Sequence, residues 1–281
     1  MNAGTATAVI TGIGNCFGTT TKTFKITPAK IKSVVLSSSS FVYDHAAKTP
    51  AVTVKSGLVT LNEGTDYTVS YKNNVNAGTA TAVITGIGNY SGTITKTFKI
   101  TKANLGKASV KVSQGSVTYS GRALKPSVVV KLNGKTLRNG TDYTVSYKSN
   151  KNVGIAKVTV TGKGSYTGTK TATFKIVPKG TSVSKLAKAK KGFTVKWKKP
   201  SKANLKQTTG YQVRWSLKKS MKGAKAKAVK ATSSAGKKCT LKVSKLKGGK
   251  KYYVQVRAYK KVGGKTYYSG WSKAKAVKTK K

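Results

Sequence analysis

The stretch Gly64-Thr-Asp-Tyr-Thr-Val-Ser-Tyr-Lys72 decides the fold, and it returns unchanged at Gly140–Lys148. Within it, Tyr67, Val69 and Tyr71 alternate with Thr, Ser and Lys, so the large side chains fall on one face of an extended chain. Alternation with period two is typical of a β-strand that buries one face against a core. The stretch therefore predicts one such strand in each of two equivalent folding units.

The repetition extends well beyond this strand. Asn76–Asn89 reproduces Asn2–Asn15 letter for letter, and Thr97–Ile100 returns 76 positions later as Thr173–Ile176. A period of this length indicates one folding unit used in series, and such arrays more often hold or present something than catalyse a reaction. The first copy has no counterpart of residues 30–75. We therefore expect a half-repeat with an incomplete core, and a chain that continues upstream.

Composition and turn chemistry favour strands over helices. Only 37% of the residues are hydrophobic, while Thr, Ser, Gly and Val are plentiful. Asn133-Gly134, set between apolar runs, predicts a tight hairpin. No run approaches the roughly 18 apolar residues of a membrane helix, and we expect any signal peptide to lie upstream. The predicted fold class is all-β, with antiparallel β-sandwich units in tandem, and the predicted domains are a half-repeat at 1–27, complete repeats at 28–101 and 102–178, and a different domain at 179–281.

The residues that catalysis, metal binding and cross-linking need are scarce. The chain has four acids and one histidine, whereas calcium sites need clustered oxygen ligands and zinc sites need paired Cys or His. Cys16 and Cys239 lie in different predicted domains, and the sister repeat has Tyr90 in place of Cys16. A disulfide framework would recur with the repeat. We therefore predict free thiols, no cofactor, no metal site and no enzyme.

Three polar residues invite a catalytic interpretation, and a structural one is favoured for each. His45 stands where the third repeat has Gly121, so we expect a turn and a solvated side chain rather than a general base. Asp66 recurs as Asp142 at the entrance of a predicted strand, where a carboxylate suits the backbone N–H groups of a turn. An alternative for the two aspartates stays open, namely an intramolecular Lys–Asn isopeptide bond assisted by a buried acid.

The charge of the chain is extreme and uneven. The net charge is +52, and residues 181–281 hold 32 Lys and Arg without a single Asp or Glu. Such a surface attracts polyanions, although the alternative that the lysines only solvate a face stays open. Lysine outnumbers arginine 52 to 4, which disfavours specific nucleic-acid recognition. The candidate polyanion contacts are Lys242, Lys245, Lys247, Lys250, Lys251, Lys260, Lys261, Lys265, Lys273, Lys275 and Lys278.

The last hundred residues resemble a fibronectin type III domain. Trp197 corresponds to the buried tryptophan of that family, and Leu246 and Tyr252 correspond to its tyrosine corner, where a hydroxyl ties the loop to the backbone. The usual Pro-Gly before this tyrosine is Gly248-Gly249 here, and no Arg-Gly-Asp occurs, so integrin-type adhesion does not carry over. We also expect Arg257, on the outward face of its strand, to stack on Trp271 as a cation–π pair.

The upstream repeats resemble the immunoglobulin-like repeats (MBG type) of large Gram-positive surface and secreted proteins. The resemblance rests on Tyr43-Asp-His45, the Gly64–Lys72 stretch, Asn76-Ala-Gly-Thr-Ala-Thr81 and Thr97-Phe-Lys-Ile100. Such repeats commonly stand beside fibronectin type III modules. The resemblance implies a secreted or wall-associated protein, and extracellular or cell-wall localisation, but it does not specify a ligand.

These observations together predict a non-enzymatic spacer or adhesion region of a bacterial surface or secreted protein. The basic C-terminal domain is expected to attach to an anionic cell-wall polymer by charge. Two alternatives stay open. In the first, the chain is the accessory tail of a secreted hydrolase whose catalytic domain lies upstream. In the second, it is an adhesin whose repeats bind a glycan or a host protein.

Overall fold

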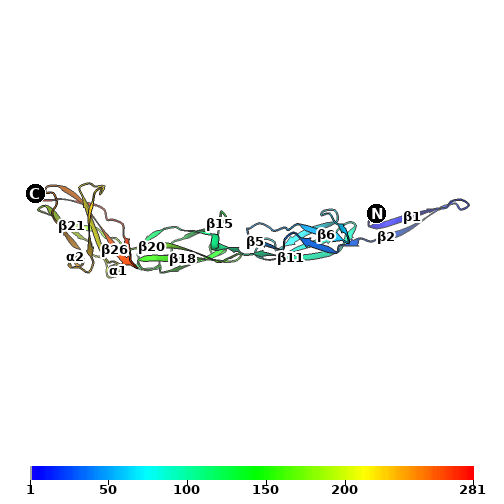
Figure 1. The fold of residues 1–281 in the computed structure, drawn as a ribbon, viewed down its shortest axis with the longest axis horizontal. Coiled ribbons are helices and arrows are strands. Elements are labelled where there is room, and N and C mark those ends of the chain that lie inside the picture. The colour runs from blue at the N-terminus through cyan, green and yellow to red at the C-terminus, as the bar shows by residue number, and fades with distance from the viewer. Residues whose placement is uncertain (1) are drawn as a thin grey trace. The chain divides into compact units, whose positions relative to one another are not determined.

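The structure, a computed structural model, describes residues 2–281, and Figure 1 shows the strands that make up most of it. Strand accounts for 55% of the chain and helix for 4%, which confirms the all-β prediction. By contacts the chain divides into two compact units. One comprises Met1–Gly106, Arg138–Thr144 and Thr161–Thr169, and the other Lys107–Leu137, Val145–Val160 and Lys170–Lys281. This division passes through the third repeat, and the domain boundaries inferred from the sequence remain predictions.

The half-repeat forms a single antiparallel hairpin of β1 (Gly4–Thr11) and β2 (Thr19–Ile26). Its large apolar side chains lack a second layer: Ile10 is 56% exposed and Phe24 51%. The equivalent residues of the second repeat, Ile84 and Phe98, are 0% and 2% exposed. The same side chains are thus buried where a second sheet exists and exposed where none does.

The second repeat is a sandwich of two sheets, with strand orders β4-β6-β7 and β5-β11-β9-β8. Val54 from the first sheet and Tyr67 and Ile84 from the second pack in one core. Within the repeated stretch Gly64–Lys72, the predicted strand forms β8, where Tyr67 is buried and Val69 and Tyr71 are half-buried. The strands are β3 (Ala29–Lys30), β4 (Ser33–Leu36), β5 (Ser40–Val42), β6 (Val52–Ser56), β7 (Val59–Thr60), β8 (Tyr67–Lys72), β9 (Gly78–Gly86), β10 (Tyr90–Ser91) and β11 (Thr93–Thr101).

The third repeat copies this arrangement, with strand orders β13-β15-β16 and β14-β20-β18-β17. The predicted hairpin at Asn133-Gly134 joins β15 to β16, and both residues have positive φ, which confirms that prediction. A 3₁₀ turn at Leu105–Lys107 follows β12. The strands are β12 (Ala103–Asn104), β13 (Ser109–Val112), β14 (Ser116–Thr118), β15 (Val128–Leu132), β16 (Lys135–Thr136), β17 (Tyr143–Lys148), β18 (Gly154–Gly162), β19 (Tyr166–Thr167) and β20 (Thr169–Val177).

Short parallel pairings close the edges of both complete repeats, a feature that the sequence did not predict. In the second repeat β5 runs parallel to β11 and β3 parallel to β10, and β14 with β20 and β12 with β19 do the same in the third. A tight hairpin joins only antiparallel strands, so each parallel partner must arrive through a longer connection from elsewhere in the chain. The alternation of apolar and polar residues within a strand does not indicate which distant strand will pair with it in parallel.

The C-terminal domain is a sandwich of two sheets, β21-β22-β25 and β24-β23-β26-β27, with β28 paired to β26. Val195, Val213, Val254 and Val256 are fully buried between the sheets. The elements are β21 (Val183–Ala189), β22 (Gly192–Trp197), α1 (Lys202–Lys206), β23 (Gly210–Ser216), β24 (Lys225–Lys230), α2 (Ser234–Lys237), β25 (Thr240–Val243), β26 (Lys251–Val262), β27 (Lys265–Tyr268) and β28 (Lys275–Lys278).

Candidate functional site

The predicted structural residues Trp197, Leu246 and Tyr252 lie at two ends of the core of the C-terminal domain. Trp197 lies beside Cys239, whereas Leu246 is bonded to Lys191, just before β22, in the turn before Tyr252. Trp197 is 3% exposed and packs against Tyr211, with ring centroids 5.0 Å apart. The backbone N–H of Lys247 donates to the Tyr252 hydroxyl at 3.2 Å, and Leu246 packs against the core. This hydrogen bond ties the turn before β26 to the side chain of Tyr252, which belongs to β26. Lys245 and Lys247, which flank Leu246, are thereby fixed at the backbone.

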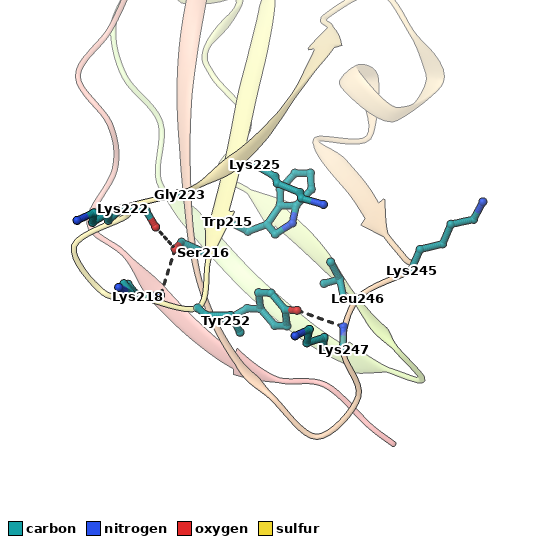
Figure 2. Close-up of a pocket in the computed structure, with 11 residues that line it drawn as sticks. Trp215, Ser216, Lys218, Lys222, Gly223, Lys225, Lys245, Leu246, Lys247 and Tyr252 are labelled. Atoms are coloured by element: carbon teal, nitrogen blue, oxygen red, sulfur yellow. Dashed lines mark hydrogen bonds between the residues drawn. The ribbon is translucent and has the colours of Figure 1, made fainter.

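A pocket of about 420 Å³ opens beside this turn, and Figure 2 shows the side chains around it. Its apolar lining comes from Trp215, Leu246, Leu217 and Tyr252. Five lysines line it as well, all of them exposed, so their charges stay hydrated. These lysines are Lys218, Lys222, Lys225, Lys245 and Lys247.

One wall of the pocket is a loop closed by a buried serine. Ser216, only 6% exposed, accepts a hydrogen bond from the Lys218 N–H at 3.1 Å through its hydroxyl oxygen. The same hydroxyl donates to the Lys222 carbonyl at 2.9 Å. Met221 completes the loop with a positive φ of 61° and a buried side chain. Both ends of the loop are therefore tied to one side chain, which fixes where two of the lysines start.

The eleven lysines predicted as polyanion contacts do not form one cluster. Lys251 of β26 lies opposite Lys278 of β28 in the strand register, near the turn that carries Lys245. Lys261 lies ten residues further along β26, about 33 Å away at the usual rise of a strand. Lys245 and Lys247 line the pocket, whereas the other nine lie on the surface around it or toward the far end. The remaining nine are Lys242, Lys250, Lys251, Lys260, Lys261, Lys265, Lys273, Lys275 and Lys278.

Sequence reasoning missed three lysines of the pocket, Lys218, Lys222 and Lys225. They belong to the loop between β23 and β24 and to the first residue of β24. The basic, Gly-containing run Leu217–Gly223 between two apolar strands was the available indication. It did not reveal that the loop faces the turn before Tyr252, because that contact joins residues about thirty positions apart in the chain.

Arg257 stacks on Trp271 as predicted, and the pair is part of a longer ladder. The Arg257 guanidinium carbon lies 4.2 Å from the Trp271 ring and 3.8 Å from the Tyr268 ring, and Arg214 covers Trp271 at 4.2 Å. Arg257 also donates through Nε and Nη2 to Gln212 Oε1, at 2.8 and 2.6 Å. Burial lowers the pKa of both guanidinium groups from the ordinary arginine value. The ladder uses the faces of these groups internally, so we assign it to stability.

Asp66 and Asp142 lie in turns at the entrances of β8 and β17. The Asp66 carboxylate accepts the Asn62 N–H at 2.9 Å, and the Asp142 carboxylate accepts the Arg138 N–H at 2.8 Å. Equivalent residues of the two repeats therefore make equivalent turns, as the structural interpretation expects. The isopeptide alternative remains a prediction.

His45 has a positive φ of 76° and an exposed side chain, but it is less free than a solvated turn residue. Its Nδ1 lies 2.9 Å from the Tyr43 hydroxyl and its Nε2 lies 2.6 Å from the Tyr166 hydroxyl. Burial first, then the Asp142 carboxylate and Tyr43, raise the pKa of Tyr166 to about 12. The histidine therefore bridges the second repeat to strand β19 of the third, a role that the sequence did not reveal.

The two cysteines are free thiols, Cys16 exposed and Cys239 buried. Among residues 2–281, no three His, Cys, Asp or Glu side chains gather closely enough to hold a metal ion. Within the same residues, no helix is both long and apolar enough to cross a membrane.

Comparison with known proteins identifies the C-terminal part of the chain. The family model of the fibronectin type III domain matches residues 177–275, which include the tryptophan, leucine and tyrosine that carried the resemblance. No curated protein gives a match. Among solved structures, the chain is similar to the FN1-FN3 domains of chicken CNTN1, with 14% identity, a TM-score of 0.32, and 90% of this chain and 100% of that chain covered.

A second similar structure is that of domains A168-A170 from titin, with 12% identity, a TM-score of 0.29, and 100% of both chains covered. The assignment of residues 2–178 to Gram-positive repeats remains a prediction. The conclusion for the C-terminal part rests on the family match together with the core of Trp197 and the bond between Tyr252 and Lys247. Residues 177–275 form a fibronectin type III domain.

Proposed function

We propose that the chain is a non-enzymatic spacer of a secreted or wall-associated bacterial protein, and that its C-terminal domain attaches to an anionic cell-wall polymer by charge. The observation that carries the proposal is the absence of any acid among residues 181–281, which hold 32 Lys and Arg. Solubility does not require this, because a surface with interspersed charges of both signs is equally soluble. A one-sided field of lysines instead favours contact with a polyanion.

The kind of lysine matters for the expected binding. The five lysines of the pocket are exposed, so each retains its hydration and acts as a point charge. Attachment of this kind releases counterions and weakens steeply with salt. If all five engage a flexible polymer, affinity falls about a hundredfold between roughly 50 and 200 mM salt.

Co-sedimentation of the 281-residue chain with purified Gram-positive cell wall tests the proposal. We expect the hundredfold fall with salt, and loss of binding when teichoic acid is stripped from the wall. The triple variant K218Q/K225Q/K245Q should bind more weakly than its matched control, K32Q/K55Q/K99Q, which removes the same charge from exposed positions of the second repeat. Retention that is insensitive to salt, or equal on stripped walls, would contradict the proposal.

A further inference from the structure

The pocket of the C-terminal domain has a feature that attachment by charge alone does not need, namely an apolar lining. A ring of lysines on a flat surface would hold a polyanion equally well. Here Trp215, Leu246 and Tyr252 line the pocket together with five lysines, and Figure 2 shows these side chains. Ligand pockets in proteins combine an apolar lining with a few polar groups that orient the ligand. This pocket has both parts and a volume, about 420 Å³, within the usual range for small ligands.

Trp215 is half-buried at the edge of the core, beside Lys225 of the neighbouring strand. Its ring packs edge-on against Phe193, with centroids 6.4 Å apart, so the core holds it from behind. The strand register places Lys225 directly opposite Trp215, on the same face of the sheet. The apolar stem of a lysine so placed covers an aromatic ring, while its ammonium group reaches water. A ligand that displaces this stem gains the indole surface.

The indole N–H of Trp215 lacks a hydrogen-bond partner within residues 2–281. Its Nε1 is buried, and no described residue of the chain accepts a hydrogen bond from it. A buried donor without an acceptor is unfavourable, so an acceptor brought by a ligand has a place to bind. The site therefore asks for three properties in one ligand: an apolar face, an oxygen acceptor and negative charge.

The backbone around these groups is fixed before any ligand binds. Ser216 closes the loop that carries Lys218 and Lys222, and Tyr252 holds the turn that carries Lys247. Preorganisation of this kind reduces the entropy that binding must otherwise lose. The lysine side chains are exposed, so their ammonium groups are accessible to an anion from solvent.

We propose that this pocket binds one anionic sugar unit of a charged glycan, with the C–H face of the ring on Trp215 and Leu246 and the anionic group on the lysines. The inference rests on the proposed function and names the unit of polymer that the domain selects. A sugar ring supplies the apolar face and the oxygen acceptors together, whereas a simple phosphate chain supplies charge and oxygen acceptors but no apolar face. Nucleic acid is disfavoured because the pocket contains lysines and no arginine.

Three polymers separate the apolar ring face from charge: dextran sulfate has both, dextran has rings without charge, and polyphosphate has charge and oxygen acceptors without rings. The readout is the amide spectrum of the whole ¹⁵N-labelled chain, in which Trp197, Trp215 and Trp271 give three indole N–H signals. We expect dextran sulfate to bind at least tenfold more tightly than polyphosphate at equal charge and to shift the Trp215 signal. Polyphosphate should bind at low salt without shifting the Trp215 signal. Dextran should neither bind measurably nor shift that signal.

Two exposed leucines provide a matched pair of variants. Leu217 lines the pocket and is 48% exposed, whereas Leu205 lies outside it on α1 and is 39% exposed. Leu217→Glu places a negative charge beside the lysines, and we expect it to weaken dextran sulfate binding about tenfold more than Leu205→Glu does. Because neither side chain is part of the buried core, both variants should fold, which the indole signals of the free proteins will check.

The outcomes distinguish the inference from the function on which it rests. Equal binding of dextran sulfate and polyphosphate, without a Trp215 shift, overturns the sugar pocket and leaves attachment by charge standing. Failure of both polyanions to bind at about 50 mM salt overturns both, since counterion-release binding is strongest there. A Trp215 shift on addition of a single-stranded oligonucleotide, with none for dextran sulfate, also overturns the sugar assignment.

Discussion

Replacement of Arg257 by lysine tests whether the ladder of cations and rings stabilises the C-terminal domain. Arg257 lies between Tyr268 and Trp271, at 3.8 and 4.2 Å, and donates two hydrogen bonds to Gln212. A lysine keeps the charge, but its compact ammonium group cannot cover two ring faces or donate in a planar fork. The substitution therefore isolates the shape of the guanidinium from its charge.

The expected loss follows from the contacts that lysine cannot keep. One of the two ring contacts is lost, at about 0.5–1 kcal/mol for a partly exposed site. One of the two hydrogen bonds to Gln212 is also lost, at about 0.5–1 kcal/mol net. The free energy of unfolding of the domain should fall by about 1–2 kcal/mol. For a domain of roughly 100 residues this lowers the melting temperature by about 5–10 °C.

Tryptophan fluorescence in urea measures this loss in the intact chain. All three tryptophans lie in the C-terminal domain, so the signal reports that domain and not the repeats. Arg214→Lys is the control, because Arg214 covers one ring face and donates to Gln255 once, at 2.7 Å. It should destabilise the domain less than Arg257→Lys. The reasoning fails if Arg257→Lys is as stable as the wild type, or if the control variant is the less stable of the two.

Three further predictions concern the repeats and the titrating groups. Amide hydrogens of β1 and β2 should exchange faster than those of β9 and β11, and a thiol reagent should modify Cys16 in the native chain but Cys239 only on unfolding; equal protection of both hairpins would contradict this. Burial raises the pKa of Tyr166 and Tyr211 to about 12, so their neutral forms stabilise the fold below about pH 10, and this contribution should disappear between pH 10 and 12 in an ultraviolet titration with parallel unfolding measurements. If Asp66 and Asp142 assist isopeptide bonds, the intact mass falls by one ammonia per bond, and an unchanged mass dismisses that alternative.

The sequence was most informative where a structural feature depends on neighbours in the chain. Alternation in Gly64–Lys72 predicts β8, and Asn133-Gly134 predicts the hairpin that the structure contains. The limits appear in the half-repeat, whose letters match those of the second repeat over fourteen positions. Ile10 is exposed and Ile84 is buried because only the latter has a second sheet above it. Whether a side chain is buried depends on the surface that packs against it, so it cannot be predicted from the segment's own sequence.

The pocket also combines residues that a local motif predicts with residues that only long-range contacts place. The lysines near Tyr252 could be predicted because the tyrosine corner is a local motif. Lys218, Lys222 and Lys225 could not, because their position depends on the Ser216 hydrogen bonds and on the register that sets Trp215 opposite Lys225. His45 escaped for a similar reason, since its partner Tyr166 lies 121 positions away.

One contact between successive domains recurs at each equivalent position of the repeat. In each case a backbone N–H donates to a side-chain oxygen of the domain that follows: Ala3 to Asn89 at 2.6 Å, Ala77 to Ser165 at 3.1 Å, and Val153 to Gln207 at 3.0 Å. The acceptors are three different residue types, and the last belongs to the fibronectin type III domain. The donor is a backbone group, so the contact asks of the next domain only an oxygen at the right place. The contact is therefore compatible with repeats added in series, because each copy brings its own backbone donor and needs only a side-chain oxygen, of no fixed residue type, on the domain that follows.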